Sequence, residues 1–395
     1  MAQLLRALLG ASEKAAGVAQ LCRQQETLFQ LLIEEKSGVD KNKKFVQDFK
    51  TLADVIIQEL IRHDIGKKFP ELQNFIGGEE SNKFENGLGE SITMRVCPTQ
   101  QETAALLCKI LDQNQKAAEL LAAAVHEEVV IQDQDLDRVS VVLPTDRLGI
   151  WIDPIDSTNQ YIRGASDVTP SASGIYSSGL RSALVLVGVY DRLTGNPVLG
   201  VINEPFVQQD PRTKRWNSRY HWGISYHGTN ICSLPRPNPG SGLSVVMSSS
   251  ESIENQQALA PICGGHVYHA AGAGYKILCV ILGLVDAYIF SGDTTFKWDT
   301  CGPHAILKAL GGNIVDLTRI REVWKEGANK LLPELTYESV QQELGAEKWA
   351  NKGGVLAFMH REHLEIIIKA LTEADQCAHS ASIHSSCMER RKDSL

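Results

Sequence analysis

One segment, residues 151–163 with the sequence W-I-D-P-I-D-S-T-N-Q-Y-I-R, constrains the fold more than any other. The apolar run 148–152 that leads into it predicts a buried strand. Pro154 has no amide hydrogen and biases the residue before it towards extended geometry, which predicts a sharp turn at residues 153–156. The short oxygen side chains of residues 156–158 are typical of a helix N-terminus. The segment therefore predicts a strand, a turn and a helix in direct succession.

The same segment carries ligand chemistry. Asp153 and Asp156 flank the proline, and the hydroxyl groups of Ser157 and Thr158 follow at the expected helix N-terminus. Carboxylate oxygens bind hard divalent cations, and a free helix N-terminus binds phosphate through its amides. A D-P-x-D sequence is equally typical of a plain Asx turn after a strand. The spacing alone leaves both interpretations open.

Two further acidic motifs lie far from this segment in the sequence. Glu79 and Glu80 follow two glycines, which let the backbone turn tightly, and Asp299 lies in K-W-D-T-C-G-P at the expected start of a helix. Taken alone, G-G-E-E is typical of a surface loop and Asp299 of a helix N-cap. If they met Asp153 and Asp156 in space, they would complete a site for several cations.

Composition excludes some classes of protein. The chain of 395 residues is 43% hydrophobic and 22% charged, which is typical of a globular protein with a large core, and its net charge of −8 argues against general nucleic-acid binding. No apolar run reaches the ~20 residues of a membrane span. Nine scattered cysteines and no signal-peptide pattern favour a cytoplasmic protein with free thiols. We expect a monomer with a small-molecule substrate and with neither nucleic-acid nor membrane partners.

The first part of the chain predicts helices and antiparallel strands. Asp54 lies among the apolar positions of a helix expected at residues 51–62, and a single long helix is expected at 98–128, begun by a Thr99–Glu102 capping box. The strands expected here form a hairpin, 184–190 with 197–203, and a tightly joined pair, 215–220 with 222–226.

The second part predicts alternating strands and helices, which indicate an α/β layer. The Pro- and Gly-rich residues 235–242 are the best candidate for a linker. We therefore expect an α+β domain at residues 1–234 that carries the Glu79 and Asp153 motifs, an α/β domain at 243–375, and a disordered tail at 376–395.

The three motifs together resemble the signatures of the lithium-sensitive, magnesium-dependent phosphomonoesterases of the inositol monophosphatase superfamily. Cys301 and Pro303 stand where many members carry small residues, whereas Trp298 and Asp299 match. The resemblance implies a layered αβαβα sandwich of the type found in inositol monophosphatase and fructose-1,6-bisphosphatase. The length of the chain and its long insert between G-G-E-E and D-P-I-D are most similar to the branch that acts on inositol polyphosphates. That branch implies magnesium-dependent, lithium-inhibited hydrolysis of the 1-phosphate of inositol 1,4-bisphosphate and inositol 1,3,4-trisphosphate by metal-activated water.

The resemblance also implies roles for individual residues. Two or three Mg²⁺ ions per active site would be bound by Glu79, Glu80, Asp153, the Ile155 carbonyl, Asp156 and Asp299. Asp54, Thr158 and Glu79 would be catalytic, and Asp54 would also govern sensitivity to Li⁺. The substrate-binding residues would be Ser157, Thr158, Ser250, Gly272, Ala273, Lys276, Thr294 and Asp299.

Other functions remain to be weighed. A 3′(2′),5′-bisphosphate nucleotidase is the alternative within the superfamily, and it would need an apolar or aromatic shelf for adenine. A non-catalytic phosphate-binding protein would keep the fold, although all the metal carboxylates are present. A dinucleotide-binding oxidoreductase is suggested only by Gly272-Ala-Gly274, which lacks the third glycine and the downstream acid of that motif.

Overall fold

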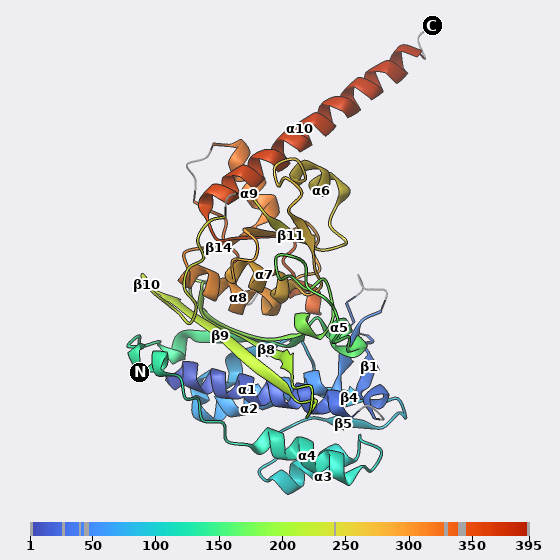
Figure 1. Ribbon diagram of the computed structural model, residues 1–395, viewed down its shortest axis with the longest axis vertical. Coiled ribbons are helices and arrows are strands. Elements are labelled where there is room, and N and C mark those ends of the chain that lie inside the picture. Colours follow the sequence, from blue (N-terminus) through green and yellow to red (C-terminus); the bar gives the residue numbers. More distant parts are fainter. Residues whose placement is uncertain are drawn as a thin grey trace.

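The computed structural model describes residues 3–25, 28–38, 41–42, 47–240, 242–327, 331–338 and 345–392, with side chains as far as residue 376. Within these residues the chain forms five layers in the order helix, sheet, helix, sheet, helix (Figure 1). The αβαβα sandwich implied by the family resemblance is therefore confirmed. Three hydrophobic clusters lie between the layers. One packs the first helices against the six-stranded sheet, one surrounds the central helices, and one packs the outer helices against the five-stranded sheet.

A six-stranded sheet forms the second layer, in the order β10-β9-β8-β7-β6-β3. All neighbours are antiparallel except β3 and β6, which run parallel. Its strands are β3 Ile76–Gly78, β6 Leu148–Asp156, β7 Leu184–Asp191, β8 Pro197–Gln209, β9 Trp216–Tyr226 and β10 Thr229–Cys232. The predicted hairpin is confirmed as β7 and β8. The prediction of two strands within residues 215–226 is wrong, because β9 pairs with β8 without interruption from Tyr220 to Ile224 and no turn residue breaks it.

The first layer covers the outer face of this sheet with α1 Gln3–Gln24 and α2 Leu52–Lys68 (Figure 1). The start of α2 is fixed by a capping box in which Thr51 and Asp54 bind each other's backbone amides. Asp54 thereby lies at the N-terminus of α2, fully buried beneath the sheet.

The single helix expected at residues 98–128 is instead two helices, α3 Gln100–Cys108 and α4 Gln115–His126. The predicted Thr99–Glu102 capping box is confirmed. The helix breaks because Asp112 and Gln113 adopt positive φ angles of 50° and 56°, and α4 then folds back onto α3. Helical periodicity does not reveal this break, because the two short helices keep similar apolar spacing on either side of it.

The central layer consists of α7 Ala273–Ile281 and α8 Lys297–Ala309, which lie between the two sheets (Figure 1). Glycines let α8 approach the six-stranded sheet closely. A methyl group on Gly200 would lie 1.9 Å from the Gly302 carbonyl oxygen, and one on Gly188 would lie 2.3 Å from the Gly302 nitrogen. This contact fixes the height of α8 above β7 and β8.

A five-stranded sheet forms the fourth layer, in the order β12-β11-β13-β15-β14. The strands β12, β11 and β13 are mutually parallel, whereas β15 is antiparallel to both of its neighbours. The strands are β11 Val245–Met247, β12 Val267–His269, β13 Ala287–Phe290, β14 Asn313–Asp316 and β15 Val355–Phe358.

The outer layer covers the far face of that sheet. It consists of α6 Ile253–Leu259, α9 Leu317–Lys325 and α10 Arg361–Lys392. Figure 1 shows α10 continuing away from the rest of the molecule. The predicted disorder of residues 376–395 stays a prediction, since the side chains beyond 376 lie outside the described residues.

The remaining elements are short. Two-stranded sheets pair β1 Ile33–Glu35 with β2 Phe49–Thr51 and β4 Lys83–Glu85 with β5 Ser91–Thr93, and α5 is Thr158–Arg163. The 3₁₀ helices are η1 Phe29–Leu32, η2 Pro70–Phe75, η3 Gln134–Arg138, η4 Thr145–Arg147, η5 Leu180–Ser182 and η6 Ala346–Trp349. The two sheets fall on either side of the predicted linker, but the central hydrophobic cluster draws residues from both parts, so the division into domains 1–234 and 243–375 stays a prediction.

Candidate active site

The strand β6 delivers two carboxylates to one side of the sheet. Asp153 pairs with Leu186 and Asp156 pairs with Leu184, so three steps on β6 face two steps on β7. This irregularity is a β-bulge, which re-aims side chains and tolerates a proline because no ladder hydrogen bond is needed there. The chain then reverses at Ser157, whose φ is 72°, and α5 begins. The predicted turn therefore lies slightly later than expected, because the strand continues through Asp156.

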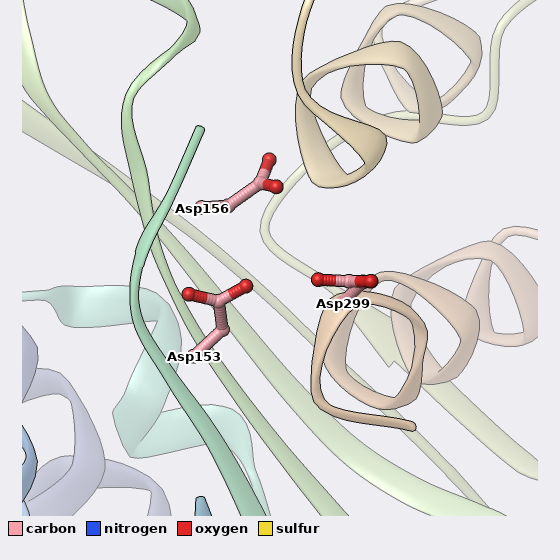
Figure 2. A group of neighbouring side chains, drawn as sticks. All are labelled: Asp153, Asp156 and Asp299. Carbon is pink, nitrogen blue, oxygen red and sulfur yellow. The ribbon is translucent and has the colours of Figure 1, made fainter. Parts of the chain in front are cut away.

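Asp299 meets these two residues from the other layer. It lies in the first turn of α8, where its Oδ2 accepts a 2.6 Å hydrogen bond from the Phe296 amide. One carboxylate oxygen from each of Asp153, Asp156 and Asp299 lies within 4.8 Å of the others, and all three residues are buried. Figure 2 shows the three carboxylates facing one another between β6 and α8.

The start of α7 fixes the orientation of Asp156. Its Oδ2 accepts a 3.3 Å hydrogen bond from the Tyr275 amide. Only glycine fits at position 274, because a methyl group there would lie 2.5 Å from Leu186 Cδ1 and 2.9 Å from the same Asp156 oxygen. Gly272 precedes α7 with a φ of 79°, a conformation that other residues rarely adopt.

Glu79 and Glu80 reach the site from β3 and contact a lysine. The Glu79 amide binds the Ile152 carbonyl at 3.1 Å, which places residue 79 beside the end of β6. The ammonium of Lys36 lies 2.9 Å from Glu79 Oε1, 2.5 Å from Glu80 Oε1 and 3.8 Å from Asp48 Oδ1. Burial opposes the charge of Lys36, but these carboxylates raise its pKa well above its usual value.

Burial and mutual repulsion disfavour the charged forms of these carboxylates. Burial raises the pKa of Asp156 to about 6, against the opposing charge of Lys276. Burial, with Glu79 and the other aspartates beside it, raises the pKa of Asp153 well above its usual value. Asp153 Oδ1 is also buried without a hydrogen-bond partner among the described residues. Closely spaced carboxylate oxygens, one of them without a hydrogen-bond partner among the described residues, are the donor set that Mg²⁺ prefers, so the residues present fit this ion.

Asp54 and Thr158, both expected to be catalytic, lie in separate hydrogen bonds. Asp54 Oδ2 accepts from the Thr51 hydroxyl at 2.7 Å, and burial raises the pKa of Asp54 to about 7. Its Oδ1 has no hydrogen-bond partner within the described ranges. The Thr158 hydroxyl donates to the Ile155 carbonyl at 3.0 Å. The catalytic roles of Asp54 and Thr158 therefore stay predictions, as does the role of the Ile155 carbonyl as a metal ligand.

A cavity of about 620 Å³ opens over the carboxylates. Glu79 and most of the predicted substrate residues line it, whereas Ser250, Asp54 and Glu80 are not among the described residues that do so. The other predicted site residues that line the cavity are Asp153, Ile155, Asp156, Ser157, Thr158, Gly272, Ala273, Lys276, Thr294 and Asp299. The substrate roles of these residues stay predictions, since the geometry gives only their position.

Two residues that position the site were missed from the sequence. Lys36 follows two glutamates in an unremarkable polar run, so its burial beside Glu79 depends on the tertiary fold. Asn351 holds the loop before α8, because its side-chain amide donates to Thr295 Oγ1, the Phe296 carbonyl and Thr300 Oγ1. Asn351 begins the run N-K-G-G just before β15, and no sequence motif links this run to Asp299.

No helix among the described residues has both the length and the apolar character needed to cross a membrane. The cysteines for which side chains are described are free, namely Cys22, Cys97, Cys108, Cys232, Cys263, Cys279 and Cys301. A cytoplasmic location and a monomeric state stay predictions.

Comparison with known proteins places the chain in a family. Inositol polyphosphate 1-phosphatase of Bos taurus is 51% identical over 393 residues, which cover 94% of this chain and 98% of the relative. The 3′(2′),5′-bisphosphate nucleotidase 1 of Rattus norvegicus is 24% identical over 76% of this chain and 82% of the relative. The crystal structure of inositol monophosphatase-II from Staphylococcus aureus MSSA476 has the same fold, with a TM-score of 0.51 and 14% identity over 94% of this chain and 96% of that one.

A family model described as the inositol monophosphatase family matches residues 98–373. These matches confirm the prediction of a phosphatase that was based on the three acidic motifs. The chain belongs to the inositol monophosphatase family.

Proposed function

We propose that this protein is a Mg²⁺-dependent, Li⁺-inhibited phosphomonoesterase that hydrolyses the 1-phosphate of inositol 1,4-bisphosphate and inositol 1,3,4-trisphosphate, with water as the nucleophile. The observation that carries the proposal is the convergence of Asp153, Asp156 and Asp299 within 4.8 Å beneath a cavity also lined by Glu79. The name and 51% identity of the bovine relative support this choice of substrate.

The acidic residues would hold the cations. Asp153 would serve two Mg²⁺ ions, one shared with Glu79 and the Ile155 carbonyl and the other with Asp156 and Asp299. Bound there, Mg²⁺ supplies Lewis-acid activation of water and stabilises the charge on the leaving oxygen. Glu80 would contribute to metal binding only indirectly, because its carboxylate is buried and ion-paired with Lys36.

The remaining residues would orient the reactants. One oxygen of the buried Asp54 carboxyl has no hydrogen-bond partner among the described residues. Burial raises the pKa of this carboxyl to about 7, so it can accept or hold a proton near neutral pH. Thr158 and Ser157 present backbone amides at the reversal after β6, where a phosphate can be hydrogen-bonded. Lys276 is buried close to Asp156 and balances part of the negative charge of the site.

The alternative, a 3′(2′),5′-bisphosphate nucleotidase, has weaker support. The rat nucleotidase is 24% identical, well below the bovine inositol polyphosphate 1-phosphatase. Phe49, Phe296 and Trp298 line the cavity. Phe296 and Trp298 are buried and stacked on each other with ring centroids 4.7 Å apart, so they are poorly placed to form a shelf for an adenine ring, whereas Phe49 is half-buried.

The test is phosphate release from inositol 1,4-bisphosphate and from adenosine 3′,5′-bisphosphate, each with Mg²⁺, with EDTA and with Mg²⁺ plus Li⁺. We expect Mg²⁺-dependent, Li⁺-inhibited release from the inositol compound. Asp153→Asn should abolish it, whereas the matched control Asp146→Asn, at an exposed aspartate shortly before β6, should not.

Faster release from the nucleotide would favour the alternative function. Retention of activity in Asp153→Asn or in EDTA would refute the metal assignment. Absence of phosphate release from either compound by the folded wild-type protein would indicate a non-catalytic phosphate-binding protein.

A further inference from the structure

Two of the three parallel strands, β11 and β12, end at the cavity. The register pairs Met247 of β11 with His269 of β12 and with Ile289 of β13, so these strands finish side by side. Residues at or just after these ends line the cavity, among them Ser248, Ser249 and His269. Ligands of α/β sheets commonly bind at the carboxyl ends of parallel strands. This edge of the five-stranded sheet therefore forms a second wall, supplied by different elements from β6 and α8.

The cavity has few positive charges with which to bind a second phosphate. Among the described residues, the basic side chains that line it belong to Lys276 and His269. Lys276 is only 4% exposed, and its ammonium donates to the Ala270 carbonyl at 3.2 Å and lies 5.2 Å from the centre of the Tyr288 ring. Because it is also close to Asp156, its charge is already used within the carboxylate cluster.

His269 is in a different situation. It is exposed at the end of β12, and no hydrogen bond or ion pair engages its side chain within the described part of the chain. Ser249 beside it is also exposed. The hydroxyl groups of Ser248 and Ser250 lie 2.9 Å apart and orient each other. An imidazole and adjacent hydroxyl groups are donors suited to a phosphate at the mouth of the cavity.

We propose that His269, with Ser248 and Ser249, binds the substrate phosphate that is not cleaved, and so selects inositol bisphosphates over inositol monophosphates. The inference rests on the proposed function and deepens it, because it names the residues that would read the second phosphate. Its physical basis is the separation of roles across one cavity, with the carboxylates at one wall and His269, Ser248 and Ser249 at the ends of β11 and β12 at the other.

The test compares two ligands that share the 1-phosphate and differ in the 4-phosphate. Inositol 1,4-bisphosphate is followed as a substrate, and inositol 1-phosphate as a substrate or a competitive inhibitor. The variants are His269→Ala, His269→Gln and His269→Lys. The matched control is His266→Ala, at an exposed histidine just before the same strand that lines a different cavity.

Loss of one charge-assisted contact at the mouth of the cavity should raise KM for the bisphosphate about tenfold. We expect His269→Ala and His269→Gln to do this with kcat unchanged and with no effect on the monophosphate. His269→Lys should restore KM, because a lysine ammonium is a strong hydrogen-bond donor to phosphate, and His266→Ala should match the wild type. A structural defect would instead affect both ligands and would not be rescued by lysine.

An unchanged KM for the bisphosphate in a folded His269→Ala or His269→Gln protein would overturn the inference, and so would an equal loss of affinity for both ligands. Failure of the wild-type protein to hydrolyse inositol 1,4-bisphosphate would refute the proposed function instead. The two failures are therefore separate outcomes of the same set of measurements.

Discussion

The substitution Asp156→Asn should stabilise the metal-free protein while it destroys the metal site. Burial raises the folded-state pKa of Asp156 from 3.8 to about 6. The folded protein therefore holds this proton more tightly than the unfolded chain does. The free energy of unfolding therefore falls as pH rises from about 4 to about 6, and it stays lower by a constant amount at higher pH. A shift of roughly two pKa units corresponds to about 3 kcal/mol.

Asparagine removes the charge but keeps a side-chain oxygen that can accept from the Tyr275 amide. In EDTA at pH 7.5 we expect the variant to gain up to about 3 kcal/mol in free energy of unfolding. With an unfolding entropy of roughly 2 cal/mol/K per residue, this gain raises the melting temperature by about 4 °C. At pH 4 the gain should nearly vanish. Mg²⁺ should raise the melting temperature of the wild type but have little effect on the variant.

The assay is thermal unfolding of the wild type, Asp156→Asn and the control Asp167→Asn, at an exposed aspartate, in EDTA and in Mg²⁺ at both pH values. The control should not change with either condition. A variant that is less stable than the wild type at pH 7.5 in EDTA would refute the reasoning. An equal gain at pH 4 and pH 7.5 would show that relief of charge is not its cause.

Three further predictions follow from contacts around the site. Gly200→Ala places a methyl group 1.9 Å from the Gly302 carbonyl oxygen, so it should lower the free energy of unfolding by more than about 2 kcal/mol. It should also weaken Mg²⁺ binding, as measured by calorimetry. An unchanged melting temperature would contradict the close packing of α8. Asn351→Ala removes a side-chain amide whose two N–H groups are shared among three acceptors. It should cost about 2 kcal/mol in urea unfolding and raise the Mg²⁺ dissociation constant, whereas loss of stability alone would argue against a positioning role. Lys36→Met leaves Glu80 buried without its cation and should lower the free energy of unfolding by about 3–5 kcal/mol in EDTA and by less in Mg²⁺. An equal loss in both conditions would show that Lys36 does not act by balancing charge.

The sequence predicted what is encoded locally. D-P-I-D combines a strand, a proline and two acids within a few residues, and the capping box at Thr99 depends on a residue only three positions away, so both could be recognised from the chain itself. The layered sandwich and the family came from the three acidic motifs, although the meeting of Asp299 with Asp153 could be inferred only through the resemblance.

The missed features depend on distant contacts. Lys36 is buried only because β1 and β2 bring it to Glu79 and Glu80. The break between α3 and α4 rests on two residues with positive φ, which a pattern of apolar spacing does not detect. The continuity of β9 is imposed by its partner strand β8, so the polar residues at 217–221 did not have to mark a turn.

The position of Asp299 late in the chain has a consequence for biosynthesis. On the ribosome Asp153 and Asp156 emerge first, and their third companion follows only after the strands β7–β13 have been made. A nascent chain that stalls before α8 therefore presents Asp153 and Asp156 without Asp299, so the proposed magnesium site would be incomplete. Tight binding of the ion would therefore distinguish chains in which the central helices are packed between both sheets. A product truncated before α8 would fail to bind the ion tightly.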